Sequence, residues 1–212
     1  MAGLRRLKDE RVAAPLPELA TERLAVRLVR PGMEAALARF LTENFEGHLD
    51  RWSPPTTPAF FSEAFWRERL GVAVDEFQAG RSARFVLQAR SPAPGLDAPI
   101  LGTCNYTNIV RGPFLACYLG YQIARGREGQ GLMAEALRAT NEYVFDQLRL
   151  HRIMANYRPE NTRSARLLER LGFAREGVAR DYLFIDGAWR DHVLMALVNP
   201  RFDPAWVEPA GR

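Results

Sequence analysis

The sequence contains 212 residues, which suits one domain with a sizeable core, since a chain of this length buries roughly 70% of its unfolded surface. Its hydrophobic fraction of 47% and charged fraction of 25% are ordinary for a globular protein. It has neither the ~20-residue apolar run of a membrane span nor a secretory signal, so we expect a cytoplasmic protein with no membrane partner. The net charge of +4 and pI of about 9.4 fit an anionic ligand or an RNA-rich partner, but are too weak to indicate sequence-specific nucleic-acid binding.

The first part of the chain predicts an arm, a strand and two helices. Residues 1–20 carry prolines and charges without a clear period, which indicates a flexible N-terminal arm. Apolar and polar residues alternate over residues 21–29, a pattern typical of a strand. Pro31 favours the first position of a helix, where a missing N–H costs nothing. A loop rich in turn-forming residues is expected over 44–58, followed by a second helix over about 60–77.

The rest of the chain predicts a strand meander followed by alternating strands and helices. We expect strands at 84–89, 100–108, 114–123, 151–157, 181–185 and 192–198, and helices at about 132–148 and 161–172. Asp186-Gly187 is a strong hairpin-turn signal between the last two strands. This order predicts an α+β fold with a mixed sheet, forming one domain over 21–200 with a C-terminal tail at 201–212.

A glycine-containing loop at residues 125–131 separates a predicted strand from a helix. Gly129 and Gly131 let the backbone approach a ligand closely, and the unpaired N–H groups of the helix start favour an anion such as a pyrophosphate. Arg125 and Arg127 could meet further phosphate oxygens. The loop lacks the Walker lysine and the three-glycine dinucleotide spacing. The structural alternative is a tight strand-to-helix turn without a ligand.

A second motif follows one strand later. Asn161 is a good N-cap and Gly172 a good C-terminal cap, with Phe173 placed to pack back on the helix. These local features would suit any helix. What distinguishes them is their position one strand after the glycine loop.

The two motifs resemble the GNAT superfamily of N-acetyltransferases, in which a Q/R-x-x-G-x-G/A loop precedes a segment of the form N-x-x-S…L-x-x-x-G-F. The chain departs from the loop pattern at Gly126, where the family has Gln or Arg, a change that removes one side chain but not the backbone cradle. Longer stretches at 108–112, 116–121, 151–157 and 181–194 resemble the RimJ/RimL branch, and the RimJ type most closely. The resemblance covers about residues 21–200.

This resemblance implies a mostly antiparallel central sheet of about seven strands with helices on both faces. It also implies transfer of acetyl from acetyl-CoA, without a metal, to the amino-terminal α-amine of a protein. The acceptor implied is an alanine of a small-subunit ribosomal protein, with possible ribosome association, and the enzyme would be a monomer or a homodimer. Two alternatives stay open: an acetyltransferase for a small amine or peptide antibiotic, and a ribosome-assembly factor with a vestigial CoA site.

The resemblance also suggests site residues. The pantetheine arm is expected beside the strand Tyr118–Ile123, with a backbone N–H near Tyr121 as oxyanion donor. Ser164 is the candidate acid for the thiolate, by similarity to RimL-type enzymes, unless it is an ordinary helix-start residue. The expected CoA-binding residues are Leu119, Tyr121, Ile123, Arg125, Arg127, Glu128, Gly129, Gln130, Gly131, Leu132, Met133, Asn156, Asn161 and Ser164.

The general base is harder to place. An α-amine has a pKa of about 7.7–8.0, so a weak base or a water relay suffices. Asp181 is the candidate carboxylate, with Glu46 and Asp50 as alternatives from the loop; a surface role for Asp181 is the competing interpretation. The expected substrate-groove residues, which could instead pack the edge of the core, are Trp52, Tyr118, Tyr182 and Trp189.

Cys104 and Cys117 have no CxxC spacing, and the chain has only three histidines. A zinc site is therefore not expected. The cysteines are interpreted as buried, reduced thiols on strands, with a nucleophilic cysteine as the alternative.

Overall fold

The computed structural model describes residues 16–91 and 95–207; residues 1–15, which hold most of the predicted arm, and residues 208–212 of the tail lie outside it. The described part contains eight strands, namely β1 (Glu18–Ala20), β2 (Leu24–Leu28), β3 (Ala83–Ala89), β4 (Ile100–Val110), β5 (Ala116–Ile123), β6 (Arg152–Tyr157), β7 (Ala174–Ile185) and β8 (Ala188–Val198). Its α-helices are α1 (Glu34–Asn44), α2 (Glu63–Gln78), α3 (Leu132–Asp146) and α4 (Thr162–Arg170). Short helical turns lie at Phe45–Leu49, Asp50–Trp52, Pro58–Phe61, Arg125–Arg127 and Pro204–Trp206.

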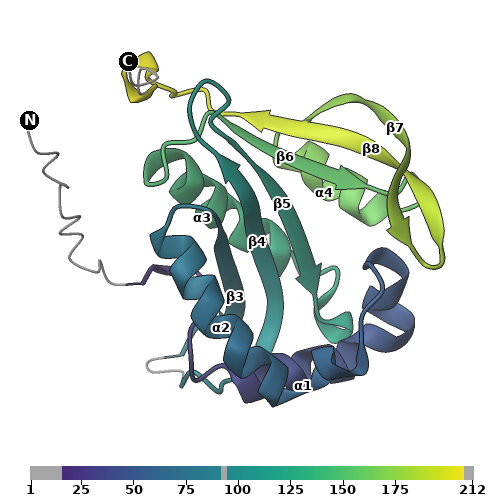
Figure 1. The fold of residues 1–212 in the computed structure, drawn as a ribbon. Helices are drawn as coiled ribbons and strands as arrows, with labels where there is room; N and C mark the ends of the chain where they lie inside the picture. Colours follow the sequence, from purple (N-terminus) through teal and green to yellow (C-terminus); the bar gives the residue numbers. More distant parts are fainter. Residues whose placement is uncertain (1–15, 92–94, 208–212) are drawn as a thin grey trace, which may run out of the picture.

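All eight strands form one sheet in the order β1-β2-β3-β4-β5-β6-β8-β7 within the described residues. Every neighbouring pair is antiparallel except β5 and β6, which run parallel. Helices α1 and α2 cover one face of the sheet, and α3 and α4 cover the other (Figure 1). The predicted α+β fold with helices on both faces is therefore confirmed, with one strand more than expected.

Two apolar clusters hold these layers together, because alternate residues of each strand face opposite sides. The larger cluster joins inward-facing residues of β2 to β6 to α3, including Phe85, Tyr106 and Leu137. The smaller cluster packs α1 and α2 against the opposite face around Met33 and Val86. No helix in the described part of the chain is long and apolar enough to cross a bilayer.

Three local expectations need correction. Glu18–Ala20, part of the predicted arm, pairs antiparallel with β2 as an edge strand, which a three-residue segment is too short to reveal by alternation. The first helix begins at Glu34 rather than Pro31, because Gly32 has a φ of +98° that no right-handed helix accepts. The predicted loop after Asn44 contains short helical turns up to Trp52, interrupted at Glu46 and Gly47, whose backbone angles are not helical.

Candidate active site

The sheet opens between its two parallel strands. Pairing of β5 with β6 runs from Ala116 opposite Arg152 to Leu119 opposite Ala155. Strand β5 continues to Ile123, but beyond Leu119 its only partner strand is β4. Backbone groups on the other edge of β5 are therefore available to an extended ligand entering the gap.

The glycine loop lies at the end of this open edge. Gly129 and Gly131 have φ values of +72° and +75°, in the left-handed region that glycine adopts without strain. Gly131 is the N-cap of α3 and supplies no capping side chain. The first N–H groups of a 15-residue helix therefore remain for an anion, as the sequence predicted.

Several predicted loop residues have protein partners. The Arg125 guanidinium donates to the carbonyl of Glu46 at 3.0 Å, and its backbone N–H donates to Asn44 Oδ1 at 2.9 Å. Glu128 pairs with Arg163 of α4, which joins the loop to the opposite side of the gap. Arg127 is exposed. The Gln130 side chain donates to the carbonyl of Gly126 at 2.9 Å, closing the loop on itself.

Some predicted CoA contacts can involve only backbone atoms. The side chains of Leu119, Leu132 and Met133 are buried in the larger core cluster. Ile123 is half-buried, and its carbonyl lies 3.0 Å from His48 Nε2. Asn156 is half-buried on β6, one residue past the last pair with β5, so its side chain stands where the strands diverge.

Two predicted catalytic residues meet across the gap. Tyr121 Oη on β5 and Ser164 Oγ in the first turn of α4 lie 2.7 Å apart, and either hydroxyl can donate. Asn161 Oδ1 accepts the Ser164 N–H at 3.1 Å, so Asn161 is the N-cap of α4 as expected. Burial raises the pKa of Tyr121 to about 12, although the Ser164 hydrogen bond acts in the opposite direction. The Tyr121 phenol is therefore protonated at neutral pH.

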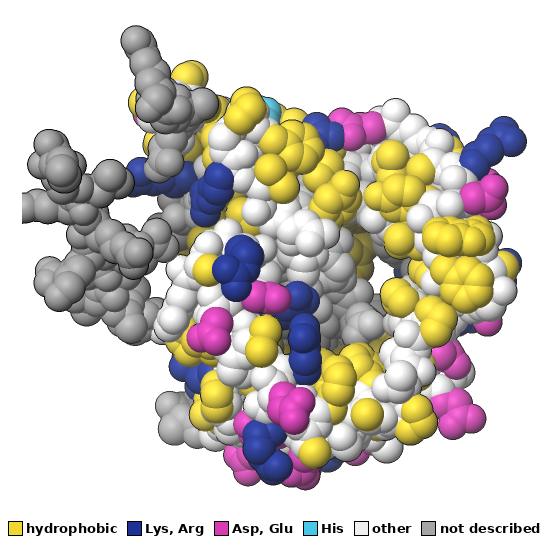
Figure 2. Space-filling model, viewed as in Figure 1, with side chains coloured by type: hydrophobic (Ala, Val, Ile, Leu, Met, Phe, Trp, Pro, Cys, Tyr) yellow, Lys and Arg dark blue, Asp and Glu magenta, His cyan; other side chains and the backbone are white. Residues whose placement is uncertain are grey.

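The α1–α2 face of the sheet carries the predicted groove residues. Burial, and then the adjacent Tyr118 hydroxyl, raises the pKa of Tyr182, which places these two tyrosines together. Trp189 is 60% exposed near the tip of the β7–β8 hairpin, in edge contact with Phe184. Figure 2 shows a hollow in this face, with hydrophobic side chains around its rim.

Trp52 forms the other part of the predicted groove and has two cationic neighbours. The guanidinium carbons of Arg51 and Arg158 lie 4.7 and 5.4 Å from its ring centroid. Arg158 also donates to the Arg51 carbonyl at 2.8 Å. Trp52 thus lies between two guanidinium groups, one of which is hydrogen-bonded to the turn that carries Trp52.

The three candidate bases, Asp181, Asp50 and Glu46, have different surroundings in the structure. Asp181 is exposed at a bulge of β7 with a φ of +47°, and its N–H donates to the Asp191 carboxylate at 2.9 Å. The Gly47 N–H is the main cause of a lowered pKa for Asp50, which makes Asp50 a weak base. The backbone carbonyl of Glu46 accepts a hydrogen bond from Arg125, and its carboxylate forms no ion pair within the part of the chain that the structure describes.

Sequence reasoning missed a histidine on this face. His192 on β8 is buried, and its ring lies 5.6 Å from that of Tyr182. His192 Nδ1 lies 2.9 Å from the carbonyl of Arg190. A carbonyl only accepts, so Nδ1 carries a proton and donates it, and the matching neutral tautomer has its lone pair on Nε2. The alternation of β8, which places residue 192 on the face opposite Val193, was the available signal.

A cavity of about 410 Å³ lies under α1 and α2, against β3, β4 and β5. Its helical wall is apolar and aromatic, whereas its floor includes Thr103, Asn105 and Gln122. Thr103 Oγ1 is buried and has no hydrogen-bond partner among the described residues. The lining includes Arg69 and Arg84 but no carboxylate, so the cavity does not suit a polycation.

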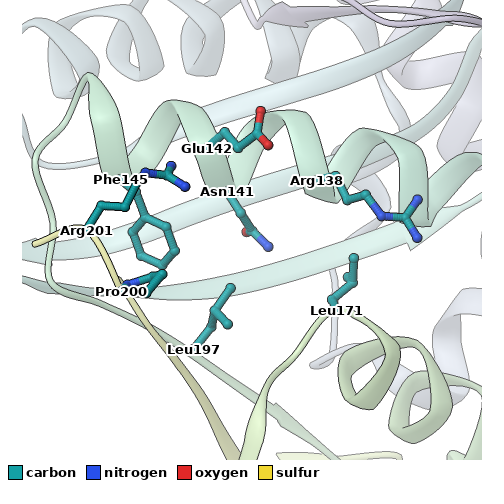
Figure 3. A pocket seen from close by; sticks show the side chains of 8 residues that line it. All are labelled: Arg138, Asn141, Glu142, Phe145, Leu171, Leu197, Pro200 and Arg201. Atoms are coloured by element: carbon teal, nitrogen blue, oxygen red, sulfur yellow. The ribbon is translucent and has the colours of Figure 1, made fainter.

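A shallower depression of about 200 Å³ lies on the other side of the molecule, between α3 and the end of β8 (Figure 3). Asn141 on its wall accepts a hydrogen bond from the buried Tyr106 hydroxyl at 2.7 Å. None of the predicted site residues lines this depression.

The structure holds no group of three or more histidine, cysteine or acidic side chains suited to a metal within the described residues. Cys104 and Cys117 are free and buried. Burial raises the pKa of Cys104 far above its ordinary value and that of Cys117 to about 12. Neither thiol is therefore a nucleophile at neutral pH.

Comparison with known proteins places these features in context. Residues 23–174 match the family model described as "Acetyltransferase (GNAT) domain". The chain is 45% identical over 190 residues to the [Ribosomal protein uS5]-alanine N-acetyltransferase of Escherichia coli (strain K12), covering 90% of this chain and 95% of that one. The match therefore spans nearly the whole of both proteins.

Solved structures agree with this relationship. The ribosomal-protein-S5-alanine acetyltransferase from Vibrio fischeri superposes with a TM-score of 0.83 at 35% identity, covering 89% of this chain and all of that one. Mycobacterium smegmatis RimJ in complex with CoA-disulfide superposes with a TM-score of 0.74 at 32% identity, covering 82% of this chain and 81% of that one.

Proposed function

Because the chain belongs to the GNAT acetyltransferase family, we propose that it transfers acetyl from acetyl-CoA to the amino-terminal α-amine of a ribosomal protein in the cytoplasm. The acceptor proposed is the first alanine of a small-subunit protein. The observation that carries this proposal is the 45% identity to a uS5-alanine N-acetyltransferase over nearly the full length of both chains.

Acetyl-CoA supplies an acetyl group activated as a thioester. The N–H groups of Gly129 to Met133 would bind its pyrophosphate, with Arg127 and the remaining donors of Arg125 facing other phosphate oxygens. The pantetheine arm would run along the free edge of β5 between Leu119 and Ile123. The left-handed glycines and the unpaired edge fit this role without rearrangement of the strands.

The residues around the gap would then act on the reacting atoms. A backbone N–H near Tyr121 would stabilise the oxyanion, an effect typically worth about 100-fold in rate or more. Ser164 would donate its proton to the leaving thiolate, and Tyr121, 2.7 Å away, would orient that hydroxyl. Asp181 would take the proton of the amine, directly or through water. His192 is a second candidate, because its Nδ1 donates to the Arg190 carbonyl and Nε2 is therefore the ring nitrogen that could accept a proton.

Tyr118, Tyr182, Trp189 and Trp52 would form the groove for the acceptor's first residues. The hollow in this face suits an extended peptide. A small polyamine would instead need an enclosed acidic pocket, whereas the cavity under α1 and α2 has arginines and no carboxylate on its wall. These features favour a protein acceptor over a small amine.

Mass spectrometry of peptides incubated with the protein and acetyl-CoA tests this proposal. The set contains an alanine-initiated ribosomal peptide, the same peptide with a blocked α-amine, a serine-initiated peptide and a polyamine. We expect the free alanine amine to be acetylated and the blocked peptide to remain unmodified. Acetylation of the polyamine alone would assign the activity to small amines. CoA binding without transfer to any acceptor would support the assembly-factor alternative.

A further inference from the structure

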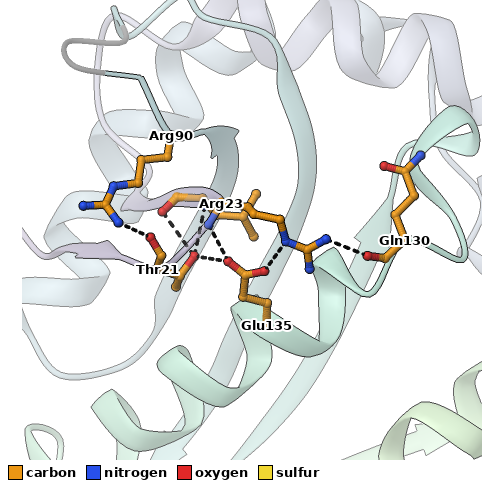
Figure 4. Close-up of polar contacts among 6 residues, drawn as sticks. Thr21, Arg23, Arg90, Gln130 and Glu135 are labelled. Atoms are coloured by element: carbon orange, nitrogen blue, oxygen red, sulfur yellow. Dashed lines mark hydrogen bonds and ion pairs between the residues drawn. The ribbon is translucent and has the colours of Figure 1, made fainter.

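Arg23, just before β2, contacts the glycine loop and the first turn of α3 at once (Figure 4). Its Nη1 donates to the Gln130 carbonyl at 2.9 Å. Its Nε donates to Glu135 Oε2 at 2.7 Å, and its backbone N–H donates to Glu135 Oε1 at 2.8 Å. The Thr21 hydroxyl also donates to Glu135 Oε1, at 2.5 Å. Arg23, which lies 107 positions from Gln130 in the sequence, thus contacts the loop on the side to which the Gln130 carbonyl points.

This contact determines which way one peptide group of the loop points. The peptide unit between Gln130 and Gly131 is planar and trans, so its C=O and N–H point in opposite directions. With the carbonyl directed toward Arg23, the Gly131 N–H is directed to the open side of the loop. Glycine at positions 129 and 131 makes rotation of neighbouring peptides easy, so the loop by itself could present a carbonyl to an anion.

Arg23 also compensates a nearby negative charge. Glu135 lies in the first turn of α3, close to the helix start proposed to bind the pyrophosphate, and would repel it. Its two oxygens are engaged by Arg23 and Thr21. The Glu135 side chain is 15% exposed and the Arg23 side chain 47% exposed, so the carboxylate is sheltered while solvent screens the pair from the Arg23 side.

We infer that Arg23 is a positioning residue that holds the glycine loop in its anion-binding conformation and neutralises Glu135. This inference rests on the proposed binding of CoA by the loop. Arg23 would act through Gln130 and Glu135 rather than on the acetyl group.

Calorimetric titration with CoA and with pantetheine, which lacks the pyrophosphate, tests this role. Arg23→Met keeps the aliphatic stem but removes the donors, and we expect the Kd for CoA to rise on the order of tenfold, as for a lost hydrogen bond to a charged group. The Kd for pantetheine should not change. Arg201→Met is the matched control, because it breaks an exposed ion pair with Asp146 at the other end of α3.

Two further variants keep the test decisive. Adding Glu135→Gln to Arg23→Met should recover part of the lost CoA affinity, because the double variant has no uncompensated carboxylate beside the helix start. A double variant that binds CoA no better than Arg23→Met would overturn the neutralising role of Arg23. Arg23→Lys, which serves if Arg23→Met does not fold, should bind CoA more weakly than wild type, since one ammonium cannot reproduce the paired contacts. Wild-type affinity in that folded variant would overturn the inference.

Gly129→Asp separates this inference from the proposed function, because a Cβ added at Gly129 meets nothing within 4 Å, whereas one added at Gly131 would lie 3.6 Å from Arg23 Nη2. If Gly129→Asp abolishes CoA binding and Arg23→Met leaves it unchanged, the loop assignment stands and only the role of Arg23 is overturned. If Gly129→Asp binds CoA normally, both the loop assignment and the role of Arg23 are overturned.

Discussion

The Ser164 hydroxyl has a neighbour that determines where its proton can go. When Tyr121 donates to Ser164 Oγ, the Ser164 proton is free to point into the gap between β5 and β6. If Ser164 donates instead, its proton lies in the hydrogen bond to Tyr121 Oη and does not point into the gap. The high pKa of Tyr121, raised mainly by burial, keeps the phenol protonated and able to donate.

We therefore expect Ser164→Ala to lower kcat by roughly 100-fold, in the range of general acid catalysis, with little change in the KM for acetyl-CoA. Tyr121→Phe should lower kcat by a smaller factor, because Ser164 remains. The double variant should be no slower than Ser164→Ala if the two hydroxyls act as a unit. Steady-state kinetics of the four proteins provide the measurement; independent, multiplying losses would contradict the coupling.

The two thiols give a second prediction at this scale. A raised pKa leaves almost no thiolate at pH 8, and the thiolate is the reactive form. Native protein treated with a chromogenic disulfide reagent should show no titratable thiol, whereas the unfolded chain should show both. Rapid reaction of a native thiol would mean that Cys104 or Cys117 is accessible and ionised.

At the scale of elements, the strand–loop–helix unit from β5 to α3 would carry the cosubstrate. Gly129→Asp places a carboxylate in the glycine loop, at a residue with a φ of +72° and nothing within 4 Å of an added Cβ. We expect it to abolish measurable CoA binding while the protein stays folded. Gly112→Asp is the matched control, since it has a φ of +71° and open space around its added Cβ. Equal affinities in the two variants would exclude the loop as the CoA site.

The β7–β8 hairpin would contact the acceptor. Trp189 is largely exposed, so its removal should cost little stability. We expect Trp189→Ala to raise the KM for an acceptor peptide several-fold and to leave the Kd for CoA unchanged. Peptide kinetics together with CoA titration test this. A change in CoA affinity without a change in peptide KM would remove the hairpin from the groove.

Local patterns predicted the elements that define the site but not how they meet. The glycine loop and the Asn161 cap were predictable because turn and cap chemistry depends on adjacent residues. The short strand β1 was missed because it depends on pairing with β2 rather than on its own pattern. Contacts such as Arg23 with Glu135 and Tyr121 with Ser164 join distant segments, so spacing in the sequence carries no signal for them.

For the whole molecule, we propose that CoA and the acceptor bind on opposite faces of the sheet. The edge of β5, the glycine loop and the start of α4 would form the CoA side. Tyr118 of β5, Tyr182 of β7, His192 and the exposed hairpin would form the acceptor side. The gap between β5 and β6 connects them, which is where an amine would reach a thioester.

Transfer to a protein α-amine is tested by tandem mass spectrometry of small-subunit ribosomal proteins with free amino termini, after incubation with the protein and labelled acetyl-CoA. We predict one protein carrying one added acetyl group on the α-amine of an initial alanine. Acetyl groups on lysine side chains, or an unmodified set of proteins beside an acetylated polyamine, would contradict the claim.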